Sequence, residues 1–202
     1  MKSWADIEIT ALAPSLRIPE ISLTNSHTGA KEAITKKDVY RIYVCGITPY
    51  DATHLGHAAT YLTFDLINRF LRAQGGEVRY VQNITDIDDP LLDRAKRDSI
   101  DWQALAESQI ELFRGDMVDL RIIPPAYYIG VVEAIPLVLD AIEKMSAAGA
   151  IYPVEKDFYF KNRNDSTFGL LSHLDNADMQ RIFAERGGDP GRAGKIDPID
   201  CL

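Results

Sequence analysis

The sequence has few cysteines, no excess of basic residues and no long apolar run. Its two cysteines, Cys45 and Cys201, cannot build a disulfide framework. The 30 acidic residues outnumber the 22 basic ones, and the resulting net charge of −8 argues against a nucleic acid as partner. The longest apolar stretch, residues 131–142, is interrupted by Glu133 and Pro136, so no segment approaches the roughly 20 apolar residues that span a membrane.

The start of the chain, residues 1–6, lacks the apolar core of a secretion signal, so we expect a cytoplasmic protein. In a reducing cytosol, a cysteine with a special role is more often a metal ligand or a nucleophile than half of a disulfide. Hydrophobic residues make up 46% of the chain and charged residues 26%, which is typical of a globular protein with an ample core.

The pattern between residues 40 and 83 predicts a strand, a helix and a second strand. Residues 40–45 alternate β-branched and aromatic side chains before Gly46, and residues 78–83 form a similar run. Between them, apolar residues recur at helical spacing from residue 55 to residue 71 and stop before Gly75. Such a βαβ crossover implies neighbouring parallel strands, so we expect an α/β fold with a Rossmann-like parallel sheet.

Further elements complete the predicted organisation. Helices are expected over residues 102–120 and 131–148, with a short β-prone piece at 157–160. No second parallel-strand unit is evident, so we expect a fragment that ends before the second half of the fold. The chain is divided into an extended lead-in (1–38, punctuated by Pro14 and Pro19), the first half of the Rossmann-like domain (39–121) and a connective, mostly helical insertion (122–202).

The residues after the first predicted strand include several side chains that can bind a ligand or a metal. Ligands of parallel α/β sheets bind at the carboxyl ends of the strands, where helix N-termini point. Cys45 ends the first strand, and His54 and His57 lie three residues apart at the start of the helix, so both rings are expected on one face. Gly56 is expected to leave room for a ligand at the backbone. The helix end and two imidazole donors predict a phosphate cradle, and simple helix capping by the histidines is the less favoured alternative.

These motifs carry a family resemblance. The tetrapeptide from His54 to His57 resembles the first signature of class I aminoacyl-tRNA synthetases. The run 45–58 followed by 83–89 resembles the cysteinyl-tRNA synthetase branch, which contains the cysteinyl-tRNA synthetases and the mycothiol-pathway ligases that join cysteine to the amine of glucosaminyl-inositol. After the lead-in the chain is similar to the ligases over nearly its whole length, including residues 185–190, and the ligase family is favoured.

The resemblance implies a fold of the class I synthetase type and an ATP-dependent ligation through a cysteinyl-adenylate. The substrates would be L-cysteine, ATP with Mg²⁺, and glucosaminyl-inositol, handled by a monomer with no membrane or nucleic-acid partner. His54 and His57 would act as the catalytic donors to ATP phosphates. The residues implied around the adenylate are Cys45, Gly46, Ile47, Thr48, Thr60, Asn83, Ile84 and Thr85.

The resemblance also implies one zinc ion per subunit, with Cys45 as a ligand that helps to select the substrate thiol. No further family ligand is evident in the sequence, and without the family Cys45 would be read as a small buried hydrophobe. For Asp86, Asp88 and Asp89, helix capping is favoured over magnesium binding. Two other functions stay open: a cysteinyl-tRNA synthetase, and a non-catalytic fragment that binds a nucleotide or zinc.

Overall fold

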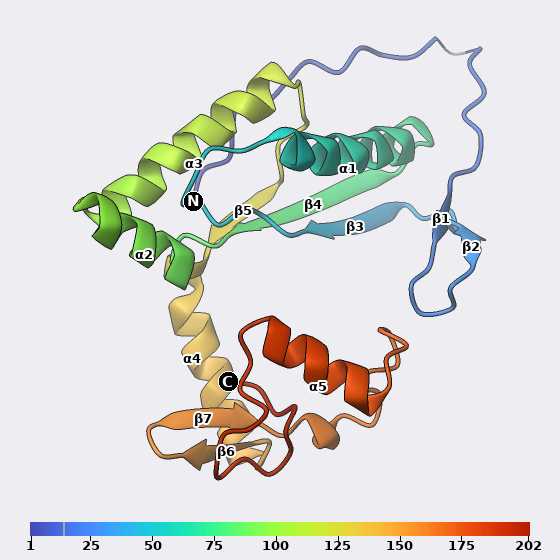
Figure 1. The fold of residues 1–202 in the computed structure, drawn as a ribbon. Coiled ribbons are helices and arrows are strands. Elements are labelled where there is room, and N and C mark those ends of the chain that lie inside the picture. Colours follow the sequence, from blue (N-terminus) through green and yellow to red (C-terminus); the bar gives the residue numbers. More distant parts are fainter. Residues whose placement is uncertain (14) are drawn as a thin grey trace. The chain divides into compact units, whose positions relative to one another are not determined.

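The computed structural model describes residues 1–13 and 15–202 (Figure 1), so Pro14 of the predicted lead-in lies outside the described residues. The chain forms two compact units. One comprises Met1–Ile21 and Ile34–Ile135, and the other comprises Ser22–Ala33 and Pro136–Leu202. These units are divided differently from the regions 1–38, 39–121 and 122–202, whose boundaries stay a prediction.

The first unit is built on a parallel sheet of three strands in the order β3-β4-β5 (Figure 1). The strands are β3 (Val39–Val44), β4 (Glu77–Ile84) and β5 (Tyr127–Gly130). Helix α1 (Leu55–Ala73) connects β3 to β4, which confirms the predicted βαβ crossover. Helices α2 (Asp89–Asp98) and α3 (Trp102–Asp119) lie between β4 and β5, which pair in parallel. The α/β fold class is therefore confirmed.

Strand β5 corrects the expectation of a single parallel-strand unit. Its four residues make the connection from β4 a second parallel crossover, with Val81 opposite Tyr127 and Ile84 opposite Gly130. So short a run after a proline pair has little periodicity of its own. It becomes a strand because β4 offers it a row of backbone partners, which is a long-range effect.

One face of this sheet carries the core of the unit. Alternate residues of the three strands, including Val44, Ile84 and Tyr128, are buried against side chains of α1 and α3 such as Tyr61 and Phe113. Each large apolar side chain buried in this way stabilises the fold by about 1.5–3 kcal/mol. The residues of the opposite face, at odd-numbered positions, are exposed or half-buried.

The N-terminal lead-in contributes to this core. The Trp4 ring packs edge-on against Phe113 and Tyr128, and its indole N–H donates to the carbonyl of Ile122 over 2.8 Å. A buried indole with its donor satisfied is a stable anchor. The first residues are thus fixed to the domain, whereas Ser22–Ala33 of the predicted lead-in form a hairpin.

The second unit contains two hairpins and the C-terminal helices. Strands β1 (Ser22–Thr24) and β2 (Lys31–Ala33) are antiparallel, as are β6 (Ile151–Val154) and β7 (Asp157–Phe160). Helix α4 (Val131–Ala147) runs from the first unit into the second, followed by the 3₁₀ turn η1 (Asn162–Asn164) and helix α5 (Asn176–Glu185). In the described part of the chain, none of the helices is long and apolar enough to cross a membrane.

The segment 185–190 is held in the second unit through Asp189, whose half-buried carboxylate meets the buried Tyr159 and Lys195 side chains. The Asp189 carboxylate accepts hydrogen bonds from the Tyr159 hydroxyl and from the Lys195 ammonium group, the latter over 2.9 Å. The ammonium group of Lys195 also lies 4.7 Å from the centre of the Phe183 ring. Because the lysine is paired and stacked, its burial is compensated. This segment therefore has a structural role in the unit.

Candidate active site at the carboxyl edge of the parallel sheet

The exits of β3 and β4 are joined by backbone contacts. The N–H of Gly46 donates to Oδ1 of Asn83 over 2.9 Å, and the N–H of Thr85 donates to the carbonyl of Ile47 over 3.0 Å. A Cβ atom at residue 46 would overlap the carbonyl oxygen of Asn83, so only glycine allows this approach. The residues predicted around an adenylate from these two segments are therefore brought together.

The two histidines of the helix motif cap α1 reciprocally. His54 is the N-cap residue, and its Nδ1 accepts from the N–H of Gly56 over 3.0 Å. Nδ1 of His57 accepts from the N–H of His54 over 3.2 Å. The ring centres are 4.2 Å apart. Capping, the alternative to a phosphate cradle, is thus present in the structure.

Capping and phosphate binding are compatible because an imidazole has two nitrogens. When Nδ1 accepts a hydrogen bond, a neutral ring carries its proton on Nε2. Both capping bonds use Nδ1, so each of His54 and His57 has an Nε2–H left to donate. The pKa of His57 is held below its usual value, first by burial and then by the neighbouring His54. The geometry of the pair therefore leaves both Nε2 atoms available to donate to a ligand.

Gly56 has a different role from the one expected. A Cβ atom at this position would lie 2.7 Å from Cε1 and 2.9 Å from Nδ1 of His54. The space at Gly56 is thus taken by the His54 ring and not by a ligand. The expectation that Gly56 admits a ligand to the backbone is wrong, because the cap itself needs the room.

Cys45 lies at the end of β3 with its thiol exposed. The alternative reading of a small buried hydrophobe is therefore wrong. Its carbonyl accepts from the hydroxyl of Tyr61 over 3.2 Å, which connects this strand end to α1. Burial raises the pKa of that Tyr61 hydroxyl, so it stays protonated and can donate.

Zinc needs several ligands, so its fit can be tested. Structural and catalytic zinc sites use three or four protein ligands. In residues 1–13 and 15–202, no group of three or more His, Cys, Asp or Glu side chains is placed to hold a metal ion. Cys45 is one exposed thiol without companions there. The described residues do not complete a zinc site, and we derive no reaction step through this metal.

The other predicted adenylate residues differ in what they can offer. The side chains of Ile47 and Ile84 are in the core, so only their backbones can face a ligand. Thr48 is half-buried, with its hydroxyl 3.4 Å from Oδ2 of Asp88. The hydroxyl of Thr60 donates to the carbonyl of Gly56 over 3.1 Å, and Nδ2 of Asn83 donates to Oγ1 of Thr85 over 3.3 Å.

Two of the three aspartates that follow β4 act as helix caps, whereas Asp89 is the first residue of α2 itself. Asp88 is the N-cap of α2, and its carboxylate accepts from the N–H of Asp89 over 3.0 Å, which confirms the capping prediction for this residue. Asp86 caps a helix far away in sequence: its carboxylate accepts from the N–H of Val132, in the first turn of α4, over 2.9 Å. A local pattern contains no signal for that second cap.

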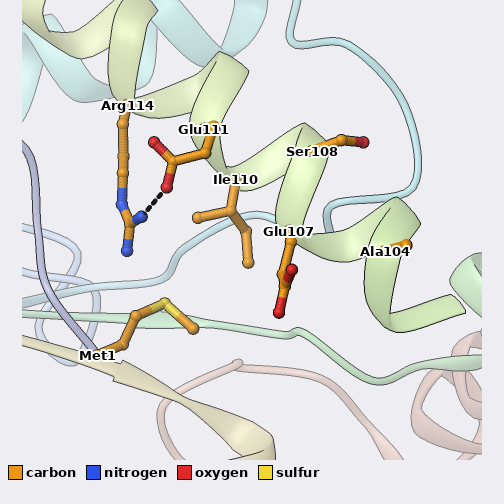
Figure 2. A pocket seen from close by; sticks show the side chains of 7 residues that line it. All are labelled: Met1, Ala104, Glu107, Ser108, Ile110, Glu111 and Arg114. Atoms are coloured by element: carbon orange, nitrogen blue, oxygen red, sulfur yellow. Dashed lines mark hydrogen bonds and ion pairs between the residues drawn. The ribbon is translucent and has the colours of Figure 1, made fainter.

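Two cavities lie beside α3 in the first unit. One, of about 480 Å³, borders His54 but is also lined by Asp116 and Asp119, whose carboxylates would repel phosphate. The other, of about 610 Å³, is lined by Met1 and by residues of α3, among them the ion pair of Arg114 with Glu111 (Figure 2). Neither is lined by Cys45 or Asn83, so the candidate site is the open edge of the sheet.

Comparison with known proteins identifies the family. The family model described as tRNA synthetases class I (C) catalytic domain matches residues 31–200. The chain belongs to this family. Membership is consistent with the parallel α/β sheet, and it confirms the resemblance drawn from the motifs.

Several curated relatives of this class I (C) synthetase chain are very similar to it. A protein of Gordonia bronchialis is 51% identical over 100% of this chain and 49% of its own length, and one of Thermobifida fusca is 53% identical over 100% and 48%. A protein of Kribbella flavida is 59% identical over 80% and 40%. Each is named L-cysteine:1D-myo-inositol 2-amino-2-deoxy-alpha-D-glucopyranoside ligase. The chain spans about half the length of these relatives, or less.

Sequence reasoning missed two tyrosines of the candidate site. Tyr61 binds the Cys45 carbonyl, and the hydroxyl of Tyr43 donates to Oδ1 of Asn83 over 3.0 Å. Partial desolvation of the hydroxyl raises the pKa of Tyr43, and the nearby Cys45 adds to the shift. The alternation of the first strand places Tyr43 and Cys45 on the same side, which was the available signal.

Proposed function

We propose that this chain carries ATP- and cysteine-binding elements of a ligase that joins L-cysteine to the amine of glucosaminyl-inositol. The observation that carries the proposal is that the two imidazoles at the N-terminus of α1 use Nδ1 for capping, which leaves each Nε2 available to a ligand, and that the preceding strand ends in an exposed cysteine. The relatives named as ligases of these substrates support the choice of reaction.

The first step of the proposed reaction forms an adenylate. The carboxylate of L-cysteine attacks the α-phosphorus of ATP, which is bound with Mg²⁺, and pyrophosphate leaves with the electrons of the broken P–O bond. Such a transfer is catalysed by positioning and by charge stabilisation. His54 and His57 would donate from Nε2 to phosphate oxygens as negative charge develops, with the positive end of α1 behind them.

The second step transfers the cysteinyl group. The free amine of glucosaminyl-inositol attacks the activated carbonyl, an amide bond forms, the amine loses a proton, and AMP leaves. No side-chain nucleophile takes part in either step. Gly46 and Thr48 from one strand exit, with Asn83 and Thr85 from the other, would surround the adenylate, and Ile47 and Ile84 would contribute backbone groups only. Thr60, whose hydroxyl donates to the Gly56 carbonyl, would contact the adenylate from its periphery.

Zinc is a separate part of the proposal. Cys45 is proposed as one ligand of a single zinc ion per subunit, which when bound would coordinate the substrate thiol and so favour cysteine over serine. The described residues supply no second ligand, and the reaction steps above do not depend on the metal. A monomer in the cytoplasm, with no nucleic-acid or membrane partner, completes the proposal.

A transfer assay tests this function. Radioactive cysteine and ATP are supplied to the protein at its natural length, with glucosaminyl-inositol or tRNA as acceptor. We expect cysteine-dependent ATP–pyrophosphate exchange and transfer to glucosaminyl-inositol. Charging of tRNA alone would identify a cysteinyl-tRNA synthetase instead, and binding of ATP without exchange would identify a non-catalytic nucleotide-binding protein.

Two variants test the role of the histidines within that assay. His54→Asn keeps a good N-cap acceptor but removes the imidazole Nε2–H, so exchange should fall while the fold remains stable. His27→Ala removes an exposed imidazole from the loop between β1 and β2, and exchange should be unchanged. Equal activity of His54→Asn and wild type would remove the observation on which the proposal depends.

A further inference from the structure

The side chain of Asn83 is held by two donors from the neighbouring strand segment. Its Oδ1 accepts from the Tyr43 hydroxyl over 3.0 Å and from the Gly46 N–H over 2.9 Å. These bonds occupy the acceptor positions of the carboxamide oxygen, so the Nδ2 group is left to point toward Thr85, 3.3 Å away. The orientation of the Asn83 amide is therefore set by Tyr43 and Gly46 together.

Tyr43 makes this contact from an exposed position. In the β3–β4 register Tyr43 lies opposite Val81, and Val81 is two residues before Asn83 in the chain. The side chain of Tyr43 is 62% exposed. Tyr127 lies on the other side of Val81 and is 56% exposed, but within the described residues its hydroxyl makes no hydrogen bond. Two tyrosines in one row of the sheet thus differ in whether their hydroxyl is engaged.

We infer that Tyr43 is a positioning residue, which orients the Asn83 carboxamide and forms a wall of the site beside Cys45. This inference rests on the proposed function. Tyr43 is two residues before Cys45, the proposed thiol-selecting position, whereas the proposed phosphate donors lie nine or more residues further along at the start of α1. The hydroxyl of Tyr43 should therefore set the affinity for cysteine and leave that for ATP nearly unchanged.

A purely structural role for the hydroxyl makes a different prediction. An exposed hydrogen bond contributes little to folding, since water replaces the lost partner. Removing the hydroxyl while keeping the ring should then change neither the melting temperature nor the kinetics. A positioning role leaves the melting temperature within about 2 °C of wild type but changes the geometry of Asn83 and the Michaelis constant for cysteine.

The test compares Tyr43→Phe with the matched control Tyr127→Phe. Side-chain amide signals of Asn83 are measured by NMR in the 202-residue chain, and cysteine-dependent ATP–pyrophosphate exchange is measured in the protein at its natural length. For Tyr43→Phe we expect shifted Asn83 amide signals and a rise of about 3- to 10-fold in the KM for cysteine, with kcat and the KM for ATP within about twofold. Tyr127→Phe should match wild type in each measurement.

The outcomes separate the inference from the proposed function. Unshifted Asn83 signals, or a KM for cysteine equal to that of Tyr127→Phe, would overturn the inference while wild-type exchange still supports the ligase. Equal rises in the KM for cysteine and for ATP would also overturn it, because the effect would not be local to the cysteine end. Absence of exchange in the wild type would overturn the proposed function, and with it the assigned role of Tyr43, whatever the NMR signals show.

Discussion

The imidazole ring of His54 occupies the space that a side chain at residue 56 would need. A Cβ atom on Gly56 would lie 2.7 Å from Cε1 of His54. The ring is folded back over the first turn of α1 because its Nδ1 accepts the N–H of Gly56 itself. The absence of a side chain at Gly56 thus allows the His54 ring to cap the helix through Nδ1, which leaves its Nε2 for a ligand.

Gly56→Ala should therefore lack the usual stabilisation by alanine and should lower activity. Alanine in a helix usually adds about 0.5–1 kcal/mol over glycine, but here the ring must leave its position and the cap is lost, at about 1 kcal/mol. The control is Gly115→Ala in α3, where a Cβ meets nothing within 4 Å and the usual gain should appear. Chemical denaturation measures both variants. An equal gain in stability for Gly56→Ala and Gly115→Ala would show that the His54 ring does not need the space at residue 56.

The lowered pKa of His57 predicts a loss of stability in acid. Burial first, and then the electrostatic effect of the neighbouring His54, lower the pKa of His57 in the folded protein below the value of about 6.5 that a histidine has in the unfolded chain. The contribution is therefore complete above about pH 6.5 and is lost as the pH falls through the lower pKa of the folded state. Protonation at Nδ1 would also break the bond from the N–H of His54.

Melting temperatures between about pH 8 and pH 5 measure this effect in wild type and in His57→Gln. The difference between the two proteins should shrink toward acid pH, because glutamine does not titrate. If the melting temperatures of wild type and His57→Gln changed in parallel with pH, His57 would have the same pKa in the folded and unfolded states.

Gly46→Ala should be among the most damaging single substitutions in the first unit. The new methyl group would overlap the Asn83 carbonyl oxygen, which belongs to the central strand and cannot rotate away. Overpacking against backbone typically costs about 1–3 kcal/mol. Gly191→Ala, where a Cβ meets nothing within 4 Å, is the control and should be nearly neutral. Denaturant titration measures the free energy of unfolding of the two variants. A Gly46→Ala protein as stable as Gly191→Ala would show that residue 46 does not approach the Asn83 carbonyl closely.

Asp86 and Asp88 should behave as caps and not as magnesium ligands. Loss of a capping carboxylate in Asp88→Ala should cost about 1 kcal/mol by releasing the first turn of α2. In Asp86→Ala the N–H of Val132 loses its partner, while Asp86→Asn keeps an acceptor and should be milder.

Thermal unfolding ranks these variants. The Mg²⁺ concentration for half-maximal exchange should change by less than about twofold in Asp88→Ala, whereas removal of a metal ligand would raise it strongly.

The fold was predictable where its signals are local. The strand at β3, the helix α1, the strand at β4 and the Asp88 cap are each specified by residues within a few positions of one another. The same is true of the histidine pair, because a spacing of three on a helix places both rings on one side. Strand β5 was missed because its four residues become a strand only through pairing with β4.

The site was predictable in its residues but not in their roles. The sequence alone predicted that the first two strands would end side by side, where Gly46 contacts Asn83, and that His54 and His57 would lie together at the start of α1. Only the tertiary structure decided that Gly56 makes room for a ring, that Asp86 caps α4 and that Tyr43 holds Asn83. The contacts of Asp86 and Tyr43 join segments 40 or more residues apart, and the pattern of either segment alone does not show how close the two lie in space. The contact of Gly56 with His54 is local, but it depends on the side-chain rotamer of His54, which the spacing of residues does not specify.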